Sequence, residues 1–455
     1  MAKRMTGDHG TDDAHRRVPR NAQLMPHWLN RDVTLLIALQ ALYSLTVGYL
    51  PIVLPLYLIS IGYGAVQLGF LLTSVSIVGA LFALASGVAS DRFGYKNAII
   101  GSSFVVAMGA LLFATTRNFY LMLVLAGISQ IIPPGGSGSG VGIGPSYPAV
   151  QALTATHVED RDRTSTLSWM ALVCCIATAI GAPIAALPEL IHHLAGVTML
   201  RGYQTVFILT ATLNLLTAVL VYPISETRRP AARPIAPAAR PAIIDDPPSN
   251  EPKIFGLSRS SWTLVWRFML VNFTNGLAVG ALGPFLTYWF VRQWGATANQ
   301  LGTLFFIINL TVILPLFMAG PLTRRFSTVG VVVGSRGFSA LFLVAMPAMP
   351  SFWLAGGAFL ARQLTNAVSV PVRQSYIMGV IRPAERASAA GIANLPIQAG
   401  LSISSIATGY LMQLALTIPI EVSAFFQLLN TLLFWIFFRS KPPVEEVYRR
   451  AQPGG

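Results

Sequence analysis

The stretch GVASDRFGYK, residues 87–96, is a short charged turn between two apolar runs at 66–90 and 98–116. Each run has about the 20 residues that a helix needs to cross the hydrocarbon core of a bilayer. Basic residues beside membrane spans tend to stay on the cytoplasmic side. We therefore expect a tight cytoplasmic loop between two transmembrane helices, in which Gly94 permits the turn.

The composition of the whole chain agrees with a membrane protein. Of its 455 residues, 54% are hydrophobic and only 11% are charged, whereas soluble domains carry about 25% charged residues. Only helices can cross the membrane at this length and hydrophobicity. We count twelve apolar segments, at 33–59, 66–90, 98–116, 119–156, 164–188, 203–223, 262–291, 298–322, 328–348, 351–381, 387–414 and 418–438.

The basic residues indicate the orientation of these segments. If both termini are inside, 24 of the 31 Lys and Arg residues lie in cytoplasmic loops and tails, and three lie outside. This bias predicts cytoplasmic N- and C-termini in a multi-pass protein of a bacterial-type inner (plasma) membrane. The net charge of +14 is thereby explained by topology, so we expect the lipid bilayer, and no nucleic acid, as a partner.

A Pro-, Ala- and Arg-rich stretch divides the apolar segments into six and six. Its composition cannot bury a core and is typical of a linker. We expect five regions: a cytoplasmic N-terminal tail at 1–32, a six-helix bundle at 33–224, a cytoplasmic linker at 225–261, a second six-helix bundle at 262–438 and a cytoplasmic C-terminal tail at 439–455.

The two halves are related by an internal repeat. The sequence QLG occurs at 67–69 and again at 300–302, an offset of 233 residues, and the offset becomes 223 where Pro148 matches Pro371. The fourth helix therefore has ten residues that the tenth lacks, and IIPPGGSGSG at 131–140 is the natural choice. We expect an insertion within an otherwise ordinary transmembrane helix.

The prolines and glycines at 133–140 oppose a continuous helix. One interpretation is an unwound segment facing a water-filled cavity, whose free N–H groups, with a half-helix starting near Val141, favour an anion. The other is an extracytoplasmic loop, with 119–132 as a short surface or re-entrant piece.

The charged turn resembles the signature loop of the major facilitator superfamily, G-x-x-x-D-R-x-G followed by basic residues. The matching residues are Gly87, Asp91, Arg92, Gly94 and Lys96. In that family the loop gates the cytoplasmic side, so the resemblance implies a gating role for these residues. The other interpretation is an ordinary charged turn that only anchors the topology.

A second, degenerate copy of this loop follows the eighth apolar segment, with Gly320, Arg324 and Arg325. The resemblance covers nearly the whole chain. It implies an all-α integral membrane protein with twelve transmembrane helices in two pseudo-symmetric six-helix bundles, around a central cavity that opens alternately to each side.

The chain departs from the family pattern at three places, and the last two weaken the case for proton-driven antiport. Tyr95 replaces a basic residue of the signature. Many proton-coupled members carry an arginine in helix four, where Ser129 and Gln130 are the best candidate positions here. The proline–glycine motif of antiporters is reduced to the Gly-Ala-Pro sequence at 181–183.

The ionisable residues inside the spans are arginines, and no acidic residue or histidine lies in the middle of a span. Arg267 and Arg336 are near cytoplasmic ends and are expected to snorkel to the interface. Arg362 lies about 16 Å into its helix, near the membrane midplane. Arg373 follows three turns later on the same face.

Asn366 and Ser369 lie on the same helix face as Arg362 and Arg373, and such a stripe is too costly to face lipid. It is either a structural network joining helix ten to helix eleven, or a site for an anionic or polar group. The candidate substrate-binding residues are Arg362, Gln363, Asn366, Ser369, Arg373, Ser129, Gln130 and Asn275.

These features favour a secondary active or facilitative transporter that moves a small, anionic or amphipathic molecule by alternating access. The alternatives are a drug or metabolite efflux antiporter and a non-transporting receptor or scaffold of the same fold. We expect no enzyme activity, catalytic residue, cofactor or metal site, because no nucleophile–base pair, nucleotide motif or spaced Cys/His set is visible. The protein is expected to be a monomer.

Overall fold

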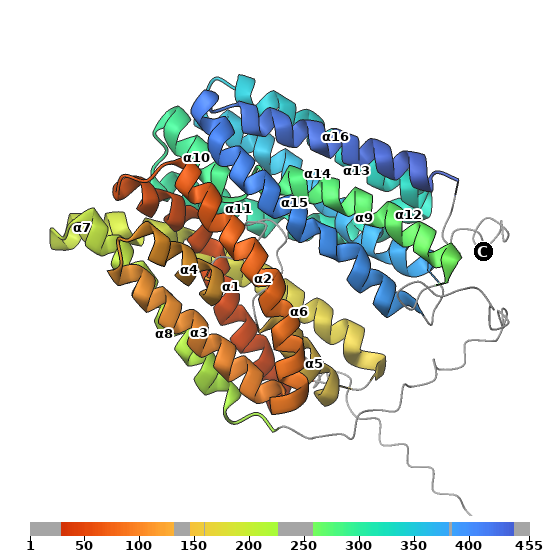
Figure 1. The fold of residues 1–455 in the computed structure, drawn as a ribbon, viewed down its shortest axis with the longest axis horizontal. Coiled ribbons are helices and arrows are strands. Elements are labelled where there is room, and N and C mark those ends of the chain that lie inside the picture. The colour runs from red at the N-terminus through yellow and green to blue at the C-terminus, as the bar shows by residue number, and fades with distance from the viewer. Residues whose placement is uncertain (1–28, 132–145, 159, 226–257, 382–384, 441–455) are drawn as a thin grey trace, which may run out of the picture.

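The computed structural model describes residues 29–131, 146–158, 160–225, 258–381 and 385–440, and their regular structure is entirely helical (Figure 1). The helices of the first half are α1 Arg31–Ser60, α2 Ala65–Phe93, α3 Tyr95–Thr115, α4 Phe119–Ser129, α5 Tyr147–His157, α6 Asp160–Gly181, the 3₁₀ turn η1 Ala182–Ala186, α7 Leu187–Ala195 and α8 Met199–Val221. Those of the second half are α9 Arg259–Gly280, α10 Gly283–Trp294, α11 Ala298–Thr311, α12 Ile313–Arg325, α13 Thr328–Ala345, the 3₁₀ turn η2 Met346–Ala348, α14 Phe352–Val380, α15 Arg386–Leu414 and α16 Ile418–Phe438.

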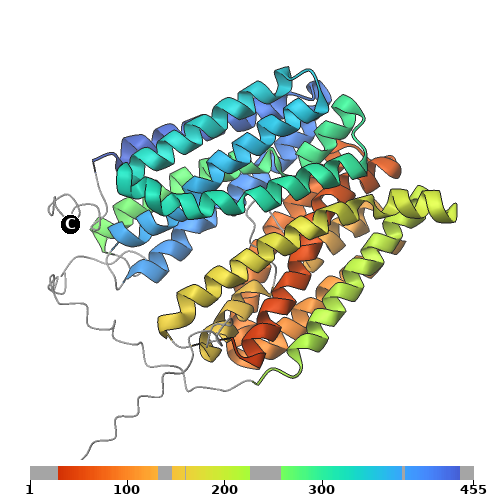
Figure 2. The same cartoon turned by 180° about the vertical axis from the view of Figure 1, so that it is seen from behind.

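These helices form two groups that lie side by side, α1–α8 and α9–α16, as Figures 1 and 2 show from opposite sides. The repeat in the sequence is visible in the helix starts. Helices α2, α3 and α4 begin at residues 65, 95 and 119, and α11, α13 and α14 begin at 298, 328 and 352, each 233 residues later. The two groups are thus built on the same order of helices.

The fold class predicted from the sequence, twelve membrane helices in an all-α protein, is confirmed. In the described part of the chain, nine helical stretches are long and apolar enough to cross a membrane. The other three expected spans correspond to α4 with α5, to α14 and to α15. Helices α14 and α15 have 29 residues each but carry more polar side chains.

Several spans are broken, and proline contributes to the breaks. The fifth span runs from α6 through the 3₁₀ turn η1 into α7, with Pro183 and Pro188 near the starts of the two later pieces. The seventh span is divided into α9 and α10, and Pro284 is the second residue of α10. The repeat-related Pro51 lies inside the continuous helix α1, so the surrounding packing decides whether a span breaks at this position.

The fourth span stops early. Helix α4 ends at Ser129, and Gln130 follows in the left-handed conformation with φ of 50°. Helix α5 begins at Tyr147. The glycine-rich segment 133–140 and the expected half-helix start at Val141 lie outside the described residues.

We call the end of the molecule at which α1 begins and α16 ends the terminal end, and the opposite end the distal end. The two halves are in contact toward the distal end. Gly69 of α2 packs on α15 so closely that an added Cβ would lie 2.6 Å from the carbonyl oxygen of Ser405. Thr73 Oγ1 donates to the carbonyl oxygen of Ser402 over 2.9 Å. Toward the terminal end the two groups of helices diverge (Figure 1).

Candidate substrate-binding site

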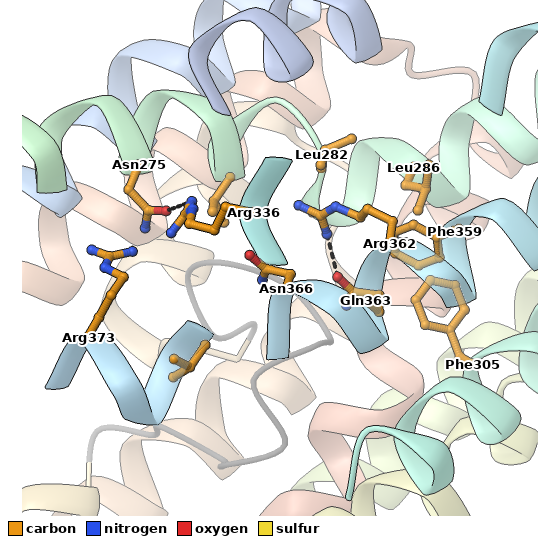
Figure 3. A pocket seen from close by; sticks show the side chains of 13 residues that line it. Asn275, Leu282, Leu286, Phe305, Arg336, Phe359, Arg362, Gln363, Asn366 and Arg373 are labelled. Atoms are coloured by element: carbon orange, nitrogen blue, oxygen red, sulfur yellow. Dashed lines mark hydrogen bonds between the residues drawn. The ribbon is translucent and has the colours of Figure 1, made fainter. Parts of the chain in front are cut away.

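A cavity of about 210 Å³ lies within the second half, between α9, α10, α11, α13 and α14. Figure 3 shows its side chains, and six of the 13 lining residues come from α14. It is lined by Asn275, Val279, Leu282, Gly283, Leu286, Phe305, Arg336, Phe359, Arg362, Gln363, Asn366, Val370 and Arg373. Three arginines therefore share one cavity inside a membrane protein.

Arg336 is held from α9. It is only 4% exposed, and its Nη2 donates to Asn275 Oδ1 over 2.6 Å. Its Nε is buried and has no hydrogen-bond partner among the described residues. The expectation that Arg336 snorkels to the interface is wrong, because its side chain turns into the protein. Arg336 is the ninth of the 18 residues of α13, and the Asn275 amide stabilises the inward orientation of its side chain.

Arg362 is held from its own helix and from α16. It is 7% exposed, and it donates from Nη1 to Gln363 Oε1 and from Nη2 to Gln427 Oε1, the latter over 3.4 Å. Its guanidinium carbon also lies 5.8 Å from the ring centroid of Phe359, a cation–π contact. Its Nε is buried without a partner in the described residues.

Arg373 is half-buried and lies three turns beyond Arg362 on α14. Its Nη2 donates to Asn272 Oδ1 over 2.7 Å. As Figure 3 shows, Arg373 and Arg336 point toward the same region, and Arg362 lies farther along the cavity beside Phe359. The face of α14 that the sequence periodicity marks as polar is thus turned toward the cavity.

All hydrogen bonds described for these three guanidinium groups end on amide oxygens of Asn or Gln. Among the described residues, none of those that line the cavity is an Asp, a Glu or a His. An amide oxygen can orient a guanidinium but cannot cancel its charge. Buried charge without a counter-charge is costly, so the arrangement suits an anion that enters from outside the protein.

The cavity also has an apolar wall. Leu282, Leu286, Phe305 and Phe359 lie around the Arg362 end, as Figure 3 shows. Binding sites for small organic molecules commonly combine such apolar walls with a few well-placed polar groups. The geometry therefore accommodates an organic molecule with a charged group and an apolar body.

Most of the candidate site residues chosen from the sequence are found together. Asn275, Arg362, Gln363, Asn366 and Arg373 line the cavity. Ser369 does not line it, because it is fully buried and donates to the carbonyl oxygen of Asn366 over 2.7 Å. Its place on the helix face next to the arginines is nevertheless as expected.

Ser129 and Gln130 lie in the other half of the molecule and are not among the residues that line this cavity. Ser129 is buried and donates to the carbonyl oxygen of Leu125 over 2.6 Å. Gln130 donates from Nε2 to the carbonyl oxygens of Val75 and Gly127 over 2.9 and 2.6 Å. In this conformation both side chains satisfy neighbouring backbone, and their role in binding stays a prediction.

The signature loop is the turn between α2 and α3. Gly94 has a φ of 91°, which an L-residue rarely adopts. Lys96 donates from Nζ to the carbonyl oxygen of Tyr222 at the end of α8, and Arg92 is exposed. Gly87 and Asp91 lie within α2. The gating role of the loop stays a prediction.

The second copy of the loop follows a similar course. Gly320, Arg324 and Arg325 lie in the last turns of α12, which ends at Arg325. The two arginines are at least partly exposed there, at the terminal end of the molecule. Positive charge at the C-terminus of a helix is favourable, because the helix dipole is negative there.

Sequence reasoning does not select Arg336, Asn272 or Gln427 for the site. It places Arg336 at the interface, and it gives no reason to choose Asn272. Gln427 lies in α16, an otherwise strongly apolar helix. A buried amide in such a helix is a signal, because it needs a polar partner, but α16 also carries the buried Asn430, and the sequence does not say which partner each amide has.

Comparisons with known proteins agree with this architecture. A sequence model of the Major Facilitator Superfamily matches residues 36–272 and 268–454. A relative in Saccharomyces cerevisiae, "Uncharacterized membrane protein YJR124C", is 23% identical over 404 residues, which are 84% of this chain and 88% of that protein.

Solved structures with the same fold include a single-residue mutant of the nucleoside transporter NupG, with a TM-score of 0.68 and 12% identity over 89% of this chain and 99% of that one. A bacterial homologue of the human lysosomal transporter Spinster, inward-facing and unoccupied, has a TM-score of 0.68 and 11% identity over 94% and 100% of the two chains. A D-xylose–proton symporter has a TM-score of 0.64 and 12% identity over 89% and 98%.

These likenesses show the fold and leave open what is carried. The family match extends through both groups of helices, and the helix arrangement is the one seen in transporters of this type. The chain is therefore a membrane protein that belongs to the Major Facilitator Superfamily.

Proposed function

We propose that this protein transports a small organic anion across the membrane by alternating access. The observation that carries the proposal is the charge of the cavity. Arg336, Arg362 and Arg373 meet there, and the amide oxygens that hold them leave their charge uncancelled. A carboxylate or phosphate can accept bidentate hydrogen bonds from a guanidinium, which an amide oxygen alone cannot match.

The competing interpretation of the arginines is a structural network. Their described side-chain partners lie on α9, α14 and α16, whereas the sequence suggested a link between the tenth and eleventh spans, α14 and α15. A network built for stability gains most from carboxylate partners that pair each buried charge. The neutral partners therefore favour the binding role.

A second function, efflux of amphipathic compounds by antiport, is favoured by the apolar wall of Leu282, Leu286 and Phe305. Antiport driven by protons needs a group that binds a proton within the membrane, usually a carboxylate or histidine. The described residues that line the cavity include no such group. We therefore rank efflux antiport second and a non-transporting receptor or scaffold third, and we propose no enzyme activity.

The remaining features are proposals from the sequence. Two bundles, 33–224 and 262–438, are joined by a cytoplasmic linker at 225–261, and both tails are cytoplasmic in an inner (plasma) membrane. With that orientation the distal end is extracytoplasmic, and the close packing of Gly69 on Ser405 closes the outer side. The structure then corresponds to an inward-facing state of a monomeric carrier.

The test is an uptake panel in proteoliposomes that contain the purified full-length chain. The labelled probes are benzoate, succinate and glycerol phosphate as anions, glucose as a neutral compound and tetraethylammonium as a cation. The proposal predicts uptake of at least one anion, competed by other anions. Uptake restricted to the neutral or cationic probes would contradict it, and uptake by protein-free vesicles is the baseline.

A further inference from the structure

We infer that Gln427 of α16 sets the net charge of the cavity and thereby the charge class of molecule that the site accepts. This inference rests on the proposed function. Gln427 is 1% exposed and is not among the residues that line the cavity. It would act through Arg362 and is therefore a positioning residue rather than a contact for substrate.

Both ends of the Gln427 amide are occupied. Its Nε2 donates to the carbonyl oxygen of Arg336 over 3.1 Å, and its Oε1 accepts from Arg362 Nη2 over 3.4 Å. The first bond fixes which atom of the amide is turned toward Arg362. One neutral side chain of α16 is thus tied to the backbone of α13 and to a guanidinium of α14.

The choice of an amide at this position has an electrostatic consequence. A glutamate of the same shape would place a carboxylate beside Arg362 and form an ion pair in a low-dielectric site, where such a pair is strong. It would also lose the N–H that reaches the Arg336 carbonyl. Gln427 therefore orients Arg362 while its positive charge remains free for an anion.

The first experiment reads the charge state of Arg362 without any substrate. Phenylglyoxal reacts with arginine side chains, and peptide mass spectrometry gives the rate at each site. Gln427→Glu should slow modification of Arg362 about tenfold, because an ion pair keeps the guanidinium protonated. Gln427→Met, which removes the acceptor, should speed it, and the Arg373 rate in the same sample is the internal reference.

A control distinguishes the direct contact between Gln427 and Arg362 from a general change in electrostatic potential within the second half. Asn309 is another buried amide of the second half, and it donates to the carbonyl oxygen of Phe305 on its own helix over 2.9 Å. Asn309→Asp should leave the ratio of Arg362 to Arg373 rates unchanged. Equal rates in wild type, Gln427→Glu and Gln427→Met would overturn the inference, as would slowing of the same size in Asn309→Asp.

The second experiment measures selectivity with the same five labelled probes. Gln427→Glu should lower uptake of the anions about tenfold relative to wild type, while Gln427→Asn, which stays neutral, keeps anion selectivity. Unchanged anion uptake by Gln427→Glu would overturn the inference. If Arg362 labelling changes as expected but wild type carries no anion, the proposed function fails and the contact between Gln427 and Arg362 stands.

A different observation carries a second inference: we propose that Glu189 locks the two halves together at the distal end. Glu189 lies in the first turn of α7, in the first half. Its Oε1 accepts a hydrogen bond of 2.9 Å from the backbone N–H of Ala298, the first residue of α11, in the second half. The bond therefore crosses between the halves.

Two features make this bond favourable. The first N–H groups of a helix have no partner within the helix, and the helix dipole is positive there. Thr297 caps the N–H of Gln300 over 3.2 Å, which leaves the N–H of Ala298 for Glu189. Nearby, an added Cβ at Gly302 would lie 3.0 Å from the carbonyl oxygen of Ala182, so η1 and α11 are in close contact and hold Glu189 in place.

Opening at the distal end must break this bond and return the carboxylate to water. Arg201 and Gln293 are exposed at the distal ends of the two halves. Spin labels at these two positions, in a Cys174→Ser, Cys175→Ser background, report the distance between the halves. Glu189→Ala, which removes the acceptor, should raise the ratio of distal-open to distal-closed protein about fivefold or more, and Glu189→Gln, which keeps an oxygen acceptor but loses the charge, should raise it by less.

Glu421 provides the matched control. It is an exposed acidic residue in the first turn of α16, at the same end of the molecule. Glu421→Gln removes the same charge without touching α11 and should leave the distance distribution unchanged. If both Glu189 variants give the wild-type distribution, or if Glu421→Gln gives an equal shift, the locking role is excluded. Neither result depends on which substrate is carried.

Discussion

Arg336 and Asn275 join α13 to α9 through a hydrogen bond of 2.6 Å between Nη2 and Oδ1. Asn275 also lines the cavity, so this amide both orients a guanidinium and borders the space into which it points. Asn275→Asp would turn the bond into an ion pair and cancel one of the three charges. We expect the KM for the transported anion to rise about tenfold, measured in proteoliposomes.

The control for this prediction is Asn275→Ser. It shortens the side chain and keeps the site neutral. If aspartate and serine raise the KM equally, the orientation of Arg336 matters and its charge does not, which would count against an anionic substrate.

Arg362→Ala should lower transport about 100-fold while the protein still reaches the membrane, because Arg362 is the arginine between the polar and apolar parts of the cavity. Arg362→Lys should recover only part of the loss, since a point charge replaces a planar bidentate donor. Membrane yield and uptake rate are measured together. If the alanine variant does not fold and Arg362→Met does not fold either, the structural-network interpretation is the better one.

Asp91→Asn should leave membrane insertion intact and slow the transport cycle, if the signature loop gates the cytoplasmic side as its resemblance to the family implies. Exchange of labelled for unlabelled substrate and net uptake are compared in the same vesicles. Normal rates in both assays would reduce the loop at 87–96 to a topology anchor. Arg92, exposed beside it, offers Arg92→Gln as a parallel change of charge.

Gly69→Val should hold the distal end open. The space beside Gly69 is filled by the Ser405 carbonyl, 2.6 Å from an added Cβ, so the two halves cannot approach as they do here. The distance between spin labels at Arg201 and Gln293 should increase in this variant. Gly101→Val is the control, because nothing lies within 4 Å of an added Cβ there. Equal distances in the two variants would refute the prediction.

Cutting the chain between 225 and 261 should leave two halves that co-purify. The prediction rests on the composition of the segment 225–261 and on the packing of α2 of the first half against α15 of the second half. A protease site is inserted into the segment, and the fragments are followed through affinity purification on one half. Separation or aggregation of the halves would mean that the chain connection itself holds the bundles together.

The parts of the fold that depend on hydrophobic length and repetition could be predicted from the sequence. The spacing of the QLG repeats at 67–69 and 300–302 equals the spacing of α2 and α11. Helical periodicity also places Arg362 and Arg373 on one face, and that face does line the cavity.

Other features depend on contacts between distant residues, which a single sequence does not contain. Whether Arg336 turns to the interface or inward depends on Asn275, 61 residues away. The partner of Gln427 is likewise set by the packing of α16 on α13 and α14. Ser129 and Gln130 are candidates only through the family pattern, and their bonds to nearby backbone follow from the early end of α4.

Among the described residues, those that line the cavity lie on α9, α10, α11, α13 and α14 or at Leu282 between α9 and α10, and none comes from the first half. If the proposed function holds, we expect the second half to determine which substrate is bound and the first half to move relative to it during transport. A hybrid that takes its first half from a relative with another cargo should keep the cargo of this chain. If it does, specificity can be redesigned through the lining residues of α9, α10, α11, α13 and α14.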